Sequence, residues 1–490
     1  MEKGEEYTRR NLELRAADFY ASLRKPESEW KTIDDLAPQL AEFEHRVHAE
    51  DYEGACRVLE PIDFDYLFLW GYYARLVEMR EKLLGRLKDP SLRAANLGSL
   101  GRAYSNLGQV EQAIGYYQQS LVIARKIGDR QNESIWLSDL GYAYNNLGQF
   151  EQAIKLYEKA LPIAREIGDR RQEGSQINCL GLTYRALGRL EQAIECHEKS
   201  LNIARAISDR ALEGLNLGNL GSVYSALGQF ERATNLYEEA FAIAREIGDR
   251  REKGSRLGSL GDVYRALGQA EKAVKLLEDA LVITREIGDR QREGRHLDNL
   301  GSAYYAVRQS ERAVKLHEEA LTIAREIGDR RGESYRLLGM GKALLTIEKL
   351  SEGRQHCAEA LALEVPETSY QAALALGIVL LQQRDPAAGK TFADAAARCR
   401  ALLDKTADLY EARYALAAAL IGRAVCDPRW AEEGERAGLL APALEEYRRA
   451  LENCAAPGVV QDALRDLEMI RAAGVEGLEP IFELLESARP

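Results

Sequence analysis

The sequence predicts an all-α solenoid built from antiparallel helix pairs, and two repeating features carry this prediction. A Leu-Gly pair recurs at a step of 40 residues, with a tyrosine three residues and an alanine twelve residues after each glycine. A Gly-Asp or Ser-Asp junction also occurs once in every repeat. A strict period of this length is typical of stacked repeat units and not of separate globular domains. The six glycines of the Leu-Gly pairs are Gly101, Gly141, Gly181, Gly221, Gly261 and Gly301.

Residues 130–168 indicate that one repeat folds as two helices. Apolar residues at helical spacing run from Trp136 to Leu147, and a second such pattern runs from Ile154 to Ile167. Spacing of three and four residues between apolar side chains is typical of an amphipathic helix. The break between the two patterns therefore predicts a helical hairpin.

The junction between repeats predicts a sharply defined turn. Gly168 suits a left-handed helix end, where a Cβ atom would be costly. Asp169 is expected to cap the next helix by accepting hydrogen bonds from its free backbone N–H groups. The capping aspartates are Asp129, Asp169, Asp209, Asp249, Asp289 and Asp329.

An arginine follows each capping aspartate, and we interpret this column as structural. It stands near glutamates such as Glu166 and Glu246, and exposed pairs of this kind contribute little each. A phosphate-binding ridge is the alternative interpretation. The column consists of Arg130, Arg170, Arg210, Arg250, Arg290 and Arg330.

Small residues in each repeat predict close packing between the two helices of a pair. Gly141 and Ala153 are expected to allow close approach, with Tyr144 and Tyr157 filling the space beside them. We therefore interpret the tyrosine column as core and not as a platform for stacking bases.

The residues just described resemble the tetratricopeptide repeat. Leu137, Leu140-Gly141, Tyr144, Ala153 and Tyr157 stand at the family's spacing, with Leu137 in place of its usual tryptophan. The resemblance implies a right-handed superhelix whose first helices line a concave groove. The repeat departs from the family in its length of 40 residues, where about 34 is usual, and in lacking a closing proline.

Two groups of tetratricopeptide repeat proteins share the longer repeat. One is the LGN/Pins type of scaffold. The other is the array that follows the nucleotide switch of bacterial STAND signalling proteins of the NB-ARC type. Residues 63–71, leading into residues 92–98, resemble the second group most.

The repeat pattern divides the chain into four expected regions. They are an N-terminal helical, diverged repeat-like region (1–92), six regular repeats (93–332), degenerate helix pairs (333–457) and a C-terminal helical cap (458–490). Within the first region, 33–60 is expected to form a diverged helix pair. Aromatic alternation over 64–72 favours a strand, but the helical pattern that follows it makes a helix the better prediction.

The degenerate region is expected to hold two further helix pairs, at about 368–402 and about 405–455. A longer irregular connection is expected near Asp427 to Gly438, inside the second of these pairs.

Composition excludes several classes of function. The chain has 490 residues and a formal net charge of −12, which argues against nucleic-acid binding. No apolar run approaches the roughly eighteen residues that span a membrane. We expect no cofactor, no metal site and no catalysis. The seven cysteines are expected to be reduced thiols of a cytoplasmic protein: Cys56, Cys179, Cys196, Cys357, Cys399, Cys426 and Cys454.

Comparison of the repeats with one another predicts the binding face. The second helices end almost identically, whereas the first helices vary just before and after Leu-Gly-x-x-Tyr. The family resemblance places these varied residues on the groove, and a solvated face without a ligand is the alternative. The predicted face comprises Arg102, Ser105, Asn106, Asp139, Tyr142, Asn145, Asn146, Asn178, Arg185, Asn219, Ser222, Asp262, Arg265, Asp298, Asn299, Ser302 and Tyr305.

The expected function is non-catalytic recognition of a protein or peptide in that groove. Asparagine both donates and accepts hydrogen bonds, which suits a peptide backbone, and arginine suits carboxylates. The STAND resemblance implies the ligand-sensing arm of a bacterial signalling protein with an attached or associated NTPase switch module. The alternatives are a freestanding adaptor like the LGN scaffolds and an enzyme accessory or self-assembling solenoid. Sequence alone does not define the oligomeric state.

Overall fold

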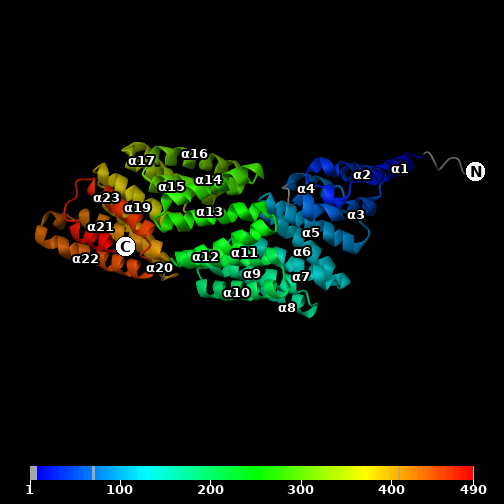
Figure 1. The fold of residues 1–490 in the computed structure, drawn as a ribbon, viewed down its shortest axis with the longest axis horizontal. Helices are drawn as coiled ribbons and strands as arrows, with labels where there is room; N and C mark the ends of the chain where they lie inside the picture. Colours follow the sequence, from blue (N-terminus) through cyan, green and yellow to red (C-terminus); the bar gives the residue numbers. More distant parts are fainter. Residues whose placement is uncertain (1–7, 69–71, 408, 489–490) are drawn as a thin grey trace, which may run out of the picture. The chain divides into compact units, whose positions relative to one another are not determined.

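The computed structural model describes residues 8–68, 72–407 and 409–488 and confirms the all-α prediction. Every regular element in these ranges is a helix. The chain forms two compact units, unit 1 from Met1 to Leu187 and unit 2 from Gly188 to Pro490. Figure 1 shows the helices following one another as hairpins along each unit. In the described part of the chain, no helix combines the length and apolar character needed to cross a bilayer.

Unit 1 holds the N-terminal helices and the first regular repeats. Short 3₁₀ helices at Glu27–Glu29 and Ile33–Leu36 precede α2, and a π-helix at Asp63–Phe68 follows α3. The α-helices are α1 (Arg9–Ser22), α2 (Ala37–His48), α3 (Tyr52–Ile62), α4 (Tyr73–Glu81), α5 (Pro90–Asn106), α6 (Val110–Ile127), α7 (Arg130–Asn146), α8 (Phe150–Glu166) and α9 (Arg170–Ala186).

The N-terminal expectations agree with these elements. The pair α2 and α3 occupies the stretch expected to be a diverged helix pair. The alternating aromatic stretch is helical as far as Phe68, and residues 69–71 lie outside the described residues.

Unit 2 continues the repeats and ends in the degenerate pairs and the last two helices. Its α-helices are α10 (Leu190–Ala206), α11 (Arg210–Ala226), α12 (Phe230–Glu246), α13 (Arg250–Ala266), α14 (Ala270–Glu286), α15 (Arg290–Ala306), α16 (Ser310–Glu326), α17 (Arg330–Thr346), α18 (Leu350–Ala362), α19 (Pro366–Gln382), α20 (Ala388–Leu403), α21 (Tyr410–Val425), α22 (Glu433–Asn453), α23 (Pro457–Arg471) and α24 (Glu479–Ser487).

The irregular connection predicted near Asp427 to Gly438 is shorter than expected. A 3₁₀ helix occupies Pro428–Ala431, and α22 already begins at Glu433. Trp430 is buried, and its carbonyl accepts a hydrogen bond from Arg436 at 3.0 Å. This contact ties the connection to the first turn of α22, which the sequence pattern did not reveal.

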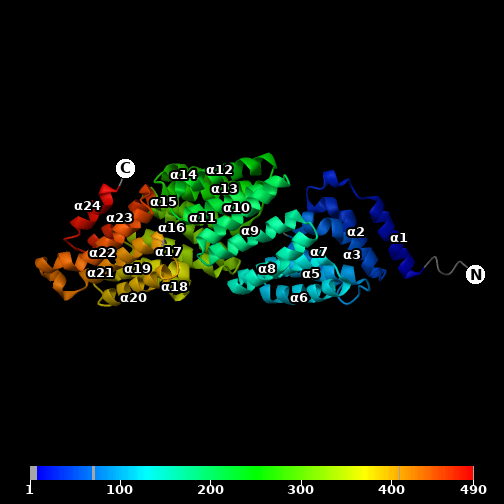
Figure 2. The ribbon, with the colours of Figure 1, turned by 90° about the horizontal axis from the view of Figure 1, so that it is seen from below.

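The first helices of the repeats form a layer of their own in each unit. Each contacts the second helix of its own pair, as in α5 with α6 and α13 with α14. First helices of neighbouring repeats also contact each other, from α5 to α7 to α9 in unit 1 and from α11 through α21 in unit 2. Figure 2 gives a second view of these stacked hairpins. This layer carries the predicted face.

The turns between repeats have the predicted local structure. Gly168 adopts a φ of +72°, and the Asp169 side chain accepts a hydrogen bond from the Gln172 N–H at 2.9 Å. Each of the other five predicted aspartates also caps its helix. The hairpin geometry is therefore encoded at every repeat boundary.

The glycine of each Leu-Gly pair makes room for an aromatic or bulky side chain of the second helix. A Cβ atom on Gly141 would lie 2.8 Å from Cε1 of the fully buried Tyr157. Ala153 is also fully buried, whereas Tyr144 is half-buried. Tyr157 is therefore the side chain that fills the space over the glycine, and Tyr144 lies further toward solvent.

Candidate functional site

The predicted face is best described through one position that recurs in every regular repeat. This position is the fourth residue after the Leu-Gly glycine, and we call its residues the plus-four column. Because first helices of neighbouring repeats contact each other, these residues follow one another along each unit. The column comprises Ser105, Asn145 and Arg185 in unit 1, and Ser225, Arg265 and Tyr305 in unit 2.

In unit 1 the start of the face is organised around an ion pair. Arg102 Nε lies 2.7 Å from Asp139 Oδ2, and the Arg102 guanidinium lies 5.0 Å from the ring centroid of Trp136. The carbonyl of Arg102 accepts a hydrogen bond from Asn106 Nδ2 at 2.9 Å. Burial, the largest single cause, lowers the pKa of Arg102, but the charge and hydrogen bond of Asp139, with smaller contributions from other groups, outweigh it and leave this pKa raised. Arg102 and Asp139 therefore neutralise each other.

The next repeat of unit 1 presents aromatic and amide groups. Tyr142 is 48% exposed, and Asn146 is exposed beside it. The side-chain oxygens Ser105 Oγ and Asn145 Oδ1 are shielded from solvent, and neither has a hydrogen-bond partner among the described residues. Arg265 Nε and Tyr305 Oη of unit 2 are likewise shielded and without such a partner, so the accessible groups of this repeat are those of Tyr142 and Asn146.

The remaining predicted residues of unit 1 lie in two different environments. Asn178 on α9 is buried, so its side chain does not lie on the accessible face. Arg185 lies exposed near the end of the same helix.

In unit 2 helix α23 covers two residues of the plus-four column, Arg265 and Tyr305. Arg265 Nη1 lies 2.9 Å from Asp462 Oδ2. The ring of Tyr305 lies 5.3 Å from the guanidinium of Arg465, which also donates a 2.7 Å hydrogen bond to the carbonyl of Ala306. The same face that was predicted to receive a partner here receives a helix of the chain itself.

Further contacts hold α23 against the other helices of unit 2. Gly458 lies so close to α13 that a Cβ atom would stand 2.1 Å from the carbonyl oxygen of Arg265. Arg308 pairs with Glu468 at 3.3 Å. A pocket of about 630 Å³ remains between the end of α23 and the turns of α15–α18, lined by Tyr305, Arg308 and other polar residues.

The other predicted residues of unit 2 are divided between partners and solvent. Asp262 is exposed and lies 3.5 Å from Arg265, which it helps to neutralise. Asp298 Oδ1 lies 2.8 Å from Nδ1 of the buried His317. The side chains that remain are all half-buried: Asn219, Ser222, Asn299 and Ser302.

A buried polar column inside the first helices was not foreseen. It stands five residues before each Leu-Gly glycine, and each member is buried. Three of them, Trp136, Arg256 and His296, pack over a glycine of the preceding repeat. The signal in the sequence was a varied position one residue before the apolar Leu137 position. Its members are Asn96, Trp136, Gln176, Asn216, Arg256 and His296.

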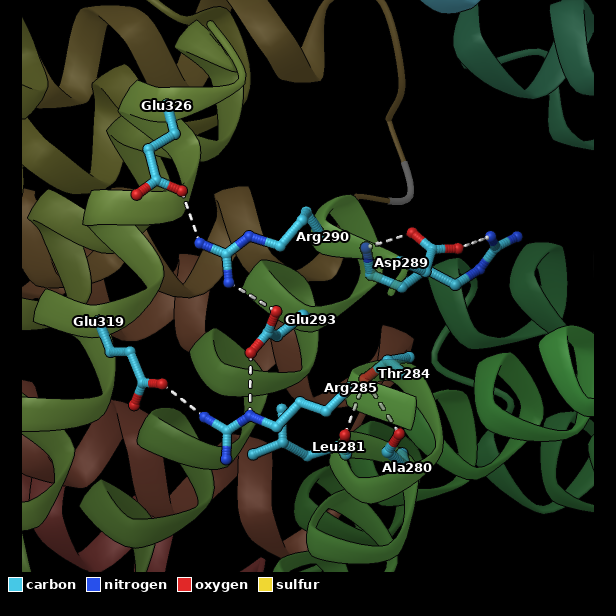
Figure 3. A network of polar contacts seen from close by, with 10 residues as sticks. Ala280, Leu281, Thr284, Arg285, Asp289, Arg290, Glu293, Glu319 and Glu326 are labelled. Atoms are coloured by element: carbon cyan, nitrogen blue, oxygen red, sulfur yellow. Dashed lines mark hydrogen bonds and ion pairs between the residues drawn. The ribbon is translucent and has the colours of Figure 1, made fainter. Parts of the chain in front are cut away.

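The arginine column behaves as the structural interpretation predicted. Arg290 lies 2.8 Å from Glu293 and 2.5 Å from Glu326, and Glu293 also pairs with Arg285 at 2.9 Å. Figure 3 shows these side chains converging on Glu293, with Arg285 reaching on to Glu319. Because these guanidinium groups already hold carboxylates of the same and the next repeat, they link neighbouring hairpins.

The cysteines carry protonated thiols at neutral pH. Burial raises the pKa of Cys179, Cys357 and Cys399 to about 12. All seven cysteines are free of disulfide bonds, and Cys56, Cys357, Cys399 and Cys454 are buried. Cys179, Cys196 and Cys426 are partly buried.

Helix hairpins whose first helices form a layer within each unit define an α-solenoid, a class whose stacked repeats present extended surfaces to other proteins. The regular repeats match the tetratricopeptide repeat family over residues 91–166, 175–246 and 256–326. These three segments of the chain are thus tetratricopeptide repeats. No curated protein matches its sequence.

Several solved structures resemble parts of this chain. The apo quorum sensor NprR from B. thuringiensis is 17% identical, over 68% of this chain and 99% of that one, with a TM-score of 0.50. A STAND protein with a tetratricopeptide repeat sensor from Pyrococcus horikoshii is 20% identical, over 72% of this chain and 52% of that one, with a TM-score of 0.48. BtubC from P. vanneervenii is 24% identical, over 45% and 92%, with a TM-score of 0.39. These similarities concern the fold.

Proposed function

We propose that this protein recognises a protein or peptide partner through the first-helix face of unit 1, formed by α5, α7 and α9. The observation that carries the proposal is the contrast between the first-helix faces of the two units. Arg265 and Tyr305 of unit 2 contact helix α23, whereas Tyr142 and Asn146 on the corresponding face of unit 1 are exposed. The chain therefore contains an example of how this column receives a helix.

Energetics favour an incoming polar group at these positions. The exposed side-chain amide of Asn146 can hydrogen-bond to a bound backbone amide, and such a neutral hydrogen bond is worth about 0.5–1.5 kcal/mol net. Asn145 can donate and accept at once, as a peptide group requires. Exposed Tyr142 adds an aromatic anchor of the type that carries much of the binding energy at interfaces.

The chemistry of the face favours an amide-rich segment over a strongly charged one. Arg102 is already neutralised by Asp139, so a carboxylate on the partner would have to displace an existing ion pair. The polar groups that remain near it are amides and hydroxyls: Ser105, Asn106, Tyr142, Asn145 and Asn146. A peptide backbone, or a helix surface rich in serine, asparagine and glutamine, matches these groups.

The biological setting in this proposal is the sensing arm of a bacterial STAND-type signalling protein. The support is the resemblance of residues 63–71 and 92–98 to the segment that precedes such arrays. In this setting, partner binding biases an NTPase switch module between two states. A freestanding adaptor of the LGN type is the second candidate, and a nucleotide-switch segment in the same reading frame would distinguish the two.

The test removes the unused groups without touching the core. The triple variant Tyr142→Ala, Asn145→Ala, Asn146→Ala is compared with Lys155→Ala, Glu158→Ala, Lys159→Ala, which alters exposed residues of α8. Full-length protein is immobilised, and proteins retained from a bacterial lysate are identified by mass spectrometry. We expect the first variant to lose the retained partner and the α8 variant to keep it.

Both variants should keep the helix content and melting temperature of the unaltered protein. A first variant that retains the same partner with unchanged yield would contradict recognition by this face. A partner lost only by the α8 variant would move the binding site to the second helices.

A further inference from the structure

Helices α1 and α2 bring together three side chains that can bind a metal ion. Glu13 lies on α1, and His45 and His48 lie three residues apart on α2. Glu13 Oε2 is 2.7 Å from His45 Nδ1 and 3.8 Å from His48 Nδ1. The three ligand atoms lie within 4.8 Å of one another. One carboxylate thus faces two imidazole nitrogens.

These distances suit a tetrahedral metal centre. Zinc binds imidazole nitrogen and carboxylate oxygen at about 2.0–2.2 Å, so the ligand atoms around it stand roughly 3.3 Å apart. The two distances to Glu13 Oε2 lie on either side of this value, and small side-chain rotations would equalise them. The rings of His45 and His48 are 6.5 Å apart and nearly perpendicular, so both can point a nitrogen at one centre.

The surroundings hold the ligands in place. The ring of His45 stacks on Tyr20 at 5.3 Å with 14° between the planes, which fixes its orientation. Arg46 stands between the two histidines in sequence, but its guanidinium pairs with Glu42 and Asp51 at 2.9 and 2.8 Å. Its positive charge is therefore compensated by carboxylates other than that of Glu13.

We propose that Glu13, His45 and His48 form a binding site for a divalent transition metal ion of the zinc type. Imidazole and carboxylate are ligands that Zn²⁺ accepts, and three protein ligands leave a fourth position for water or another donor. The exposed side of His48, 53% accessible, leaves that position open to solvent. The site lies in the N-terminal region and is separate from the proposed recognition face.

Metal binding would fasten α1 to the rest of unit 1. Ala17 is the one buried residue on α1, whereas Leu12, Phe19 and Leu23 beside it are exposed. Polar contacts help to hold the helix, among them the 3.2 Å hydrogen bond from Arg10 Nε to the carbonyl of Ala49. A metal bridging α1 and α2 would add a further contact between these two helices.

The first experiment measures Zn²⁺ binding to the full chain after removal of metal with EDTA. Calorimetric titration with ZnCl₂ should show one site that is lost, or weakened by at least about tenfold, in the double variant His45→Gln, His48→Gln. Glu13→Gln should weaken the same site. The matched control is His356→Gln, because His356 Nδ1 faces Glu359 at 3.8 Å without a third ligand.

The second experiment measures hydrogen exchange of the α1 amides, residues 9–22, with ZnCl₂ and with EDTA. We expect Zn²⁺ to slow exchange in α1 in the unaltered protein and in His356→Gln, but not in the double variant. Equal melting of all proteins in EDTA would show that the variants fold. Unchanged α1 exchange on adding Zn²⁺, or equal Zn²⁺ affinity in the double variant, would overturn the proposal and leave an imidazole–carboxylate pair.

Discussion

The residues five positions before each Leu-Gly glycine show that variation between repeats does not by itself mark a binding surface. This position holds five residue types in the six regular repeats, yet Gln176, Asn216 and His296 are all buried. Gln176 donates a hydrogen bond to Ser134 Oγ of the preceding repeat at 2.8 Å, and His296 packs over Gly258, where a Cβ atom would lie 2.4 Å from Nε2. Because each repeat has a different neighbour, each contact can hold a different side chain.

His296 should make the free energy of unfolding depend on pH. Burial, followed by the charges of Arg295 and Arg292, lowers the pKa of His296 to about 4 from its ordinary value near 6.5. Between these two pH values the unfolded chain binds a proton that the folded chain does not. The free energy of unfolding should therefore be greatest above pH 6.5 and fall as the pH is lowered toward 4, by about 2 kcal/mol at pH 5.

His296→Gln tests this prediction, because Gln176 occupies the same position in another repeat. Urea unfolding monitored at pH 8 and pH 5 should show a smaller acid loss in the variant than in the unaltered protein. His356→Gln, at a half-buried position, is the control. An identical acid loss in all three proteins would show that His296 is protonated equally in both states.

Single residues also show how far the candidate site could be predicted. The position of Tyr142, Asn145 and Asn146 on the first-helix layer follows from helical spacing and the family resemblance. The covering of Arg265 does not, because its partner Asp462 stands 197 residues further along the chain. The spacing of His45 and His48 was visible in the sequence, but Glu13 joins them only through the packing of α1 on α2.

At the scale of one helix pair, the Leu-Gly glycine and other helical glycines should respond to substitution in opposite ways. A Cβ atom on Gly141 would press against Tyr157, which is fully buried and cannot move aside, so Gly141→Ala should destabilise the pair by about 1–3 kcal/mol. A Cβ atom on Gly115 in α6 meets nothing within 4 Å. Since alanine favours helix over glycine, Gly115→Ala should stabilise by about 0.5–1 kcal/mol.

Native-state hydrogen exchange separates the two effects. Amides of α7 and α8 should exchange faster in Gly141→Ala, and amides of α6 should exchange more slowly in Gly115→Ala. If both variants exchanged alike, the tyrosine would not be the reason for the recurring glycine.

Helices and turns of this protein were largely predictable because each is encoded locally. The capping aspartates, the left-handed glycines and the apolar spacing act within a few residues, so their structural effect can be read from a short window. The connection after α21 was predicted less well. Its length depends on the burial of Trp430, and a short stretch of sequence does not reveal which side chain will be buried.

At the scale of the whole molecule, unit 2 departs from a simple array of repeats. In such an array each repeat contacts only its neighbours, and stability is close to a sum of local terms. Here α23 contacts α13 and α19 as well as α21 and α24, so it joins helices that lie far apart in sequence. Its buried side chains Val460, Leu464, Leu467 and Ile470 share one apolar cluster with Leu260 and Val263 of α13. The last helices are therefore part of the core of unit 2.

This contact pattern predicts which helices a core substitution will destabilise. Leu467 is fully buried, and Leu467→Ala should cost about 2–5 kcal/mol. Because α23 packs on α13, hydrogen exchange should accelerate in α13, α19 and α21, including residues about two hundred positions earlier in the chain. Leu137→Ala in α7 is the comparison, since α7 contacts only helices from α5 to α9 among the stronger packing pairs of unit 1.

In Leu137→Ala the faster exchange should stay within α5–α9. Should Leu467→Ala affect only α21–α24, α23 would be an end cap that covers the last hairpin, and the covering of Arg265 would be a surface contact of little energetic weight. Faster exchange in α13 would instead show that the plus-four column of unit 2 depends on α23 for its stability, because removing one apolar contact of that helix would loosen the helix that carries Arg265.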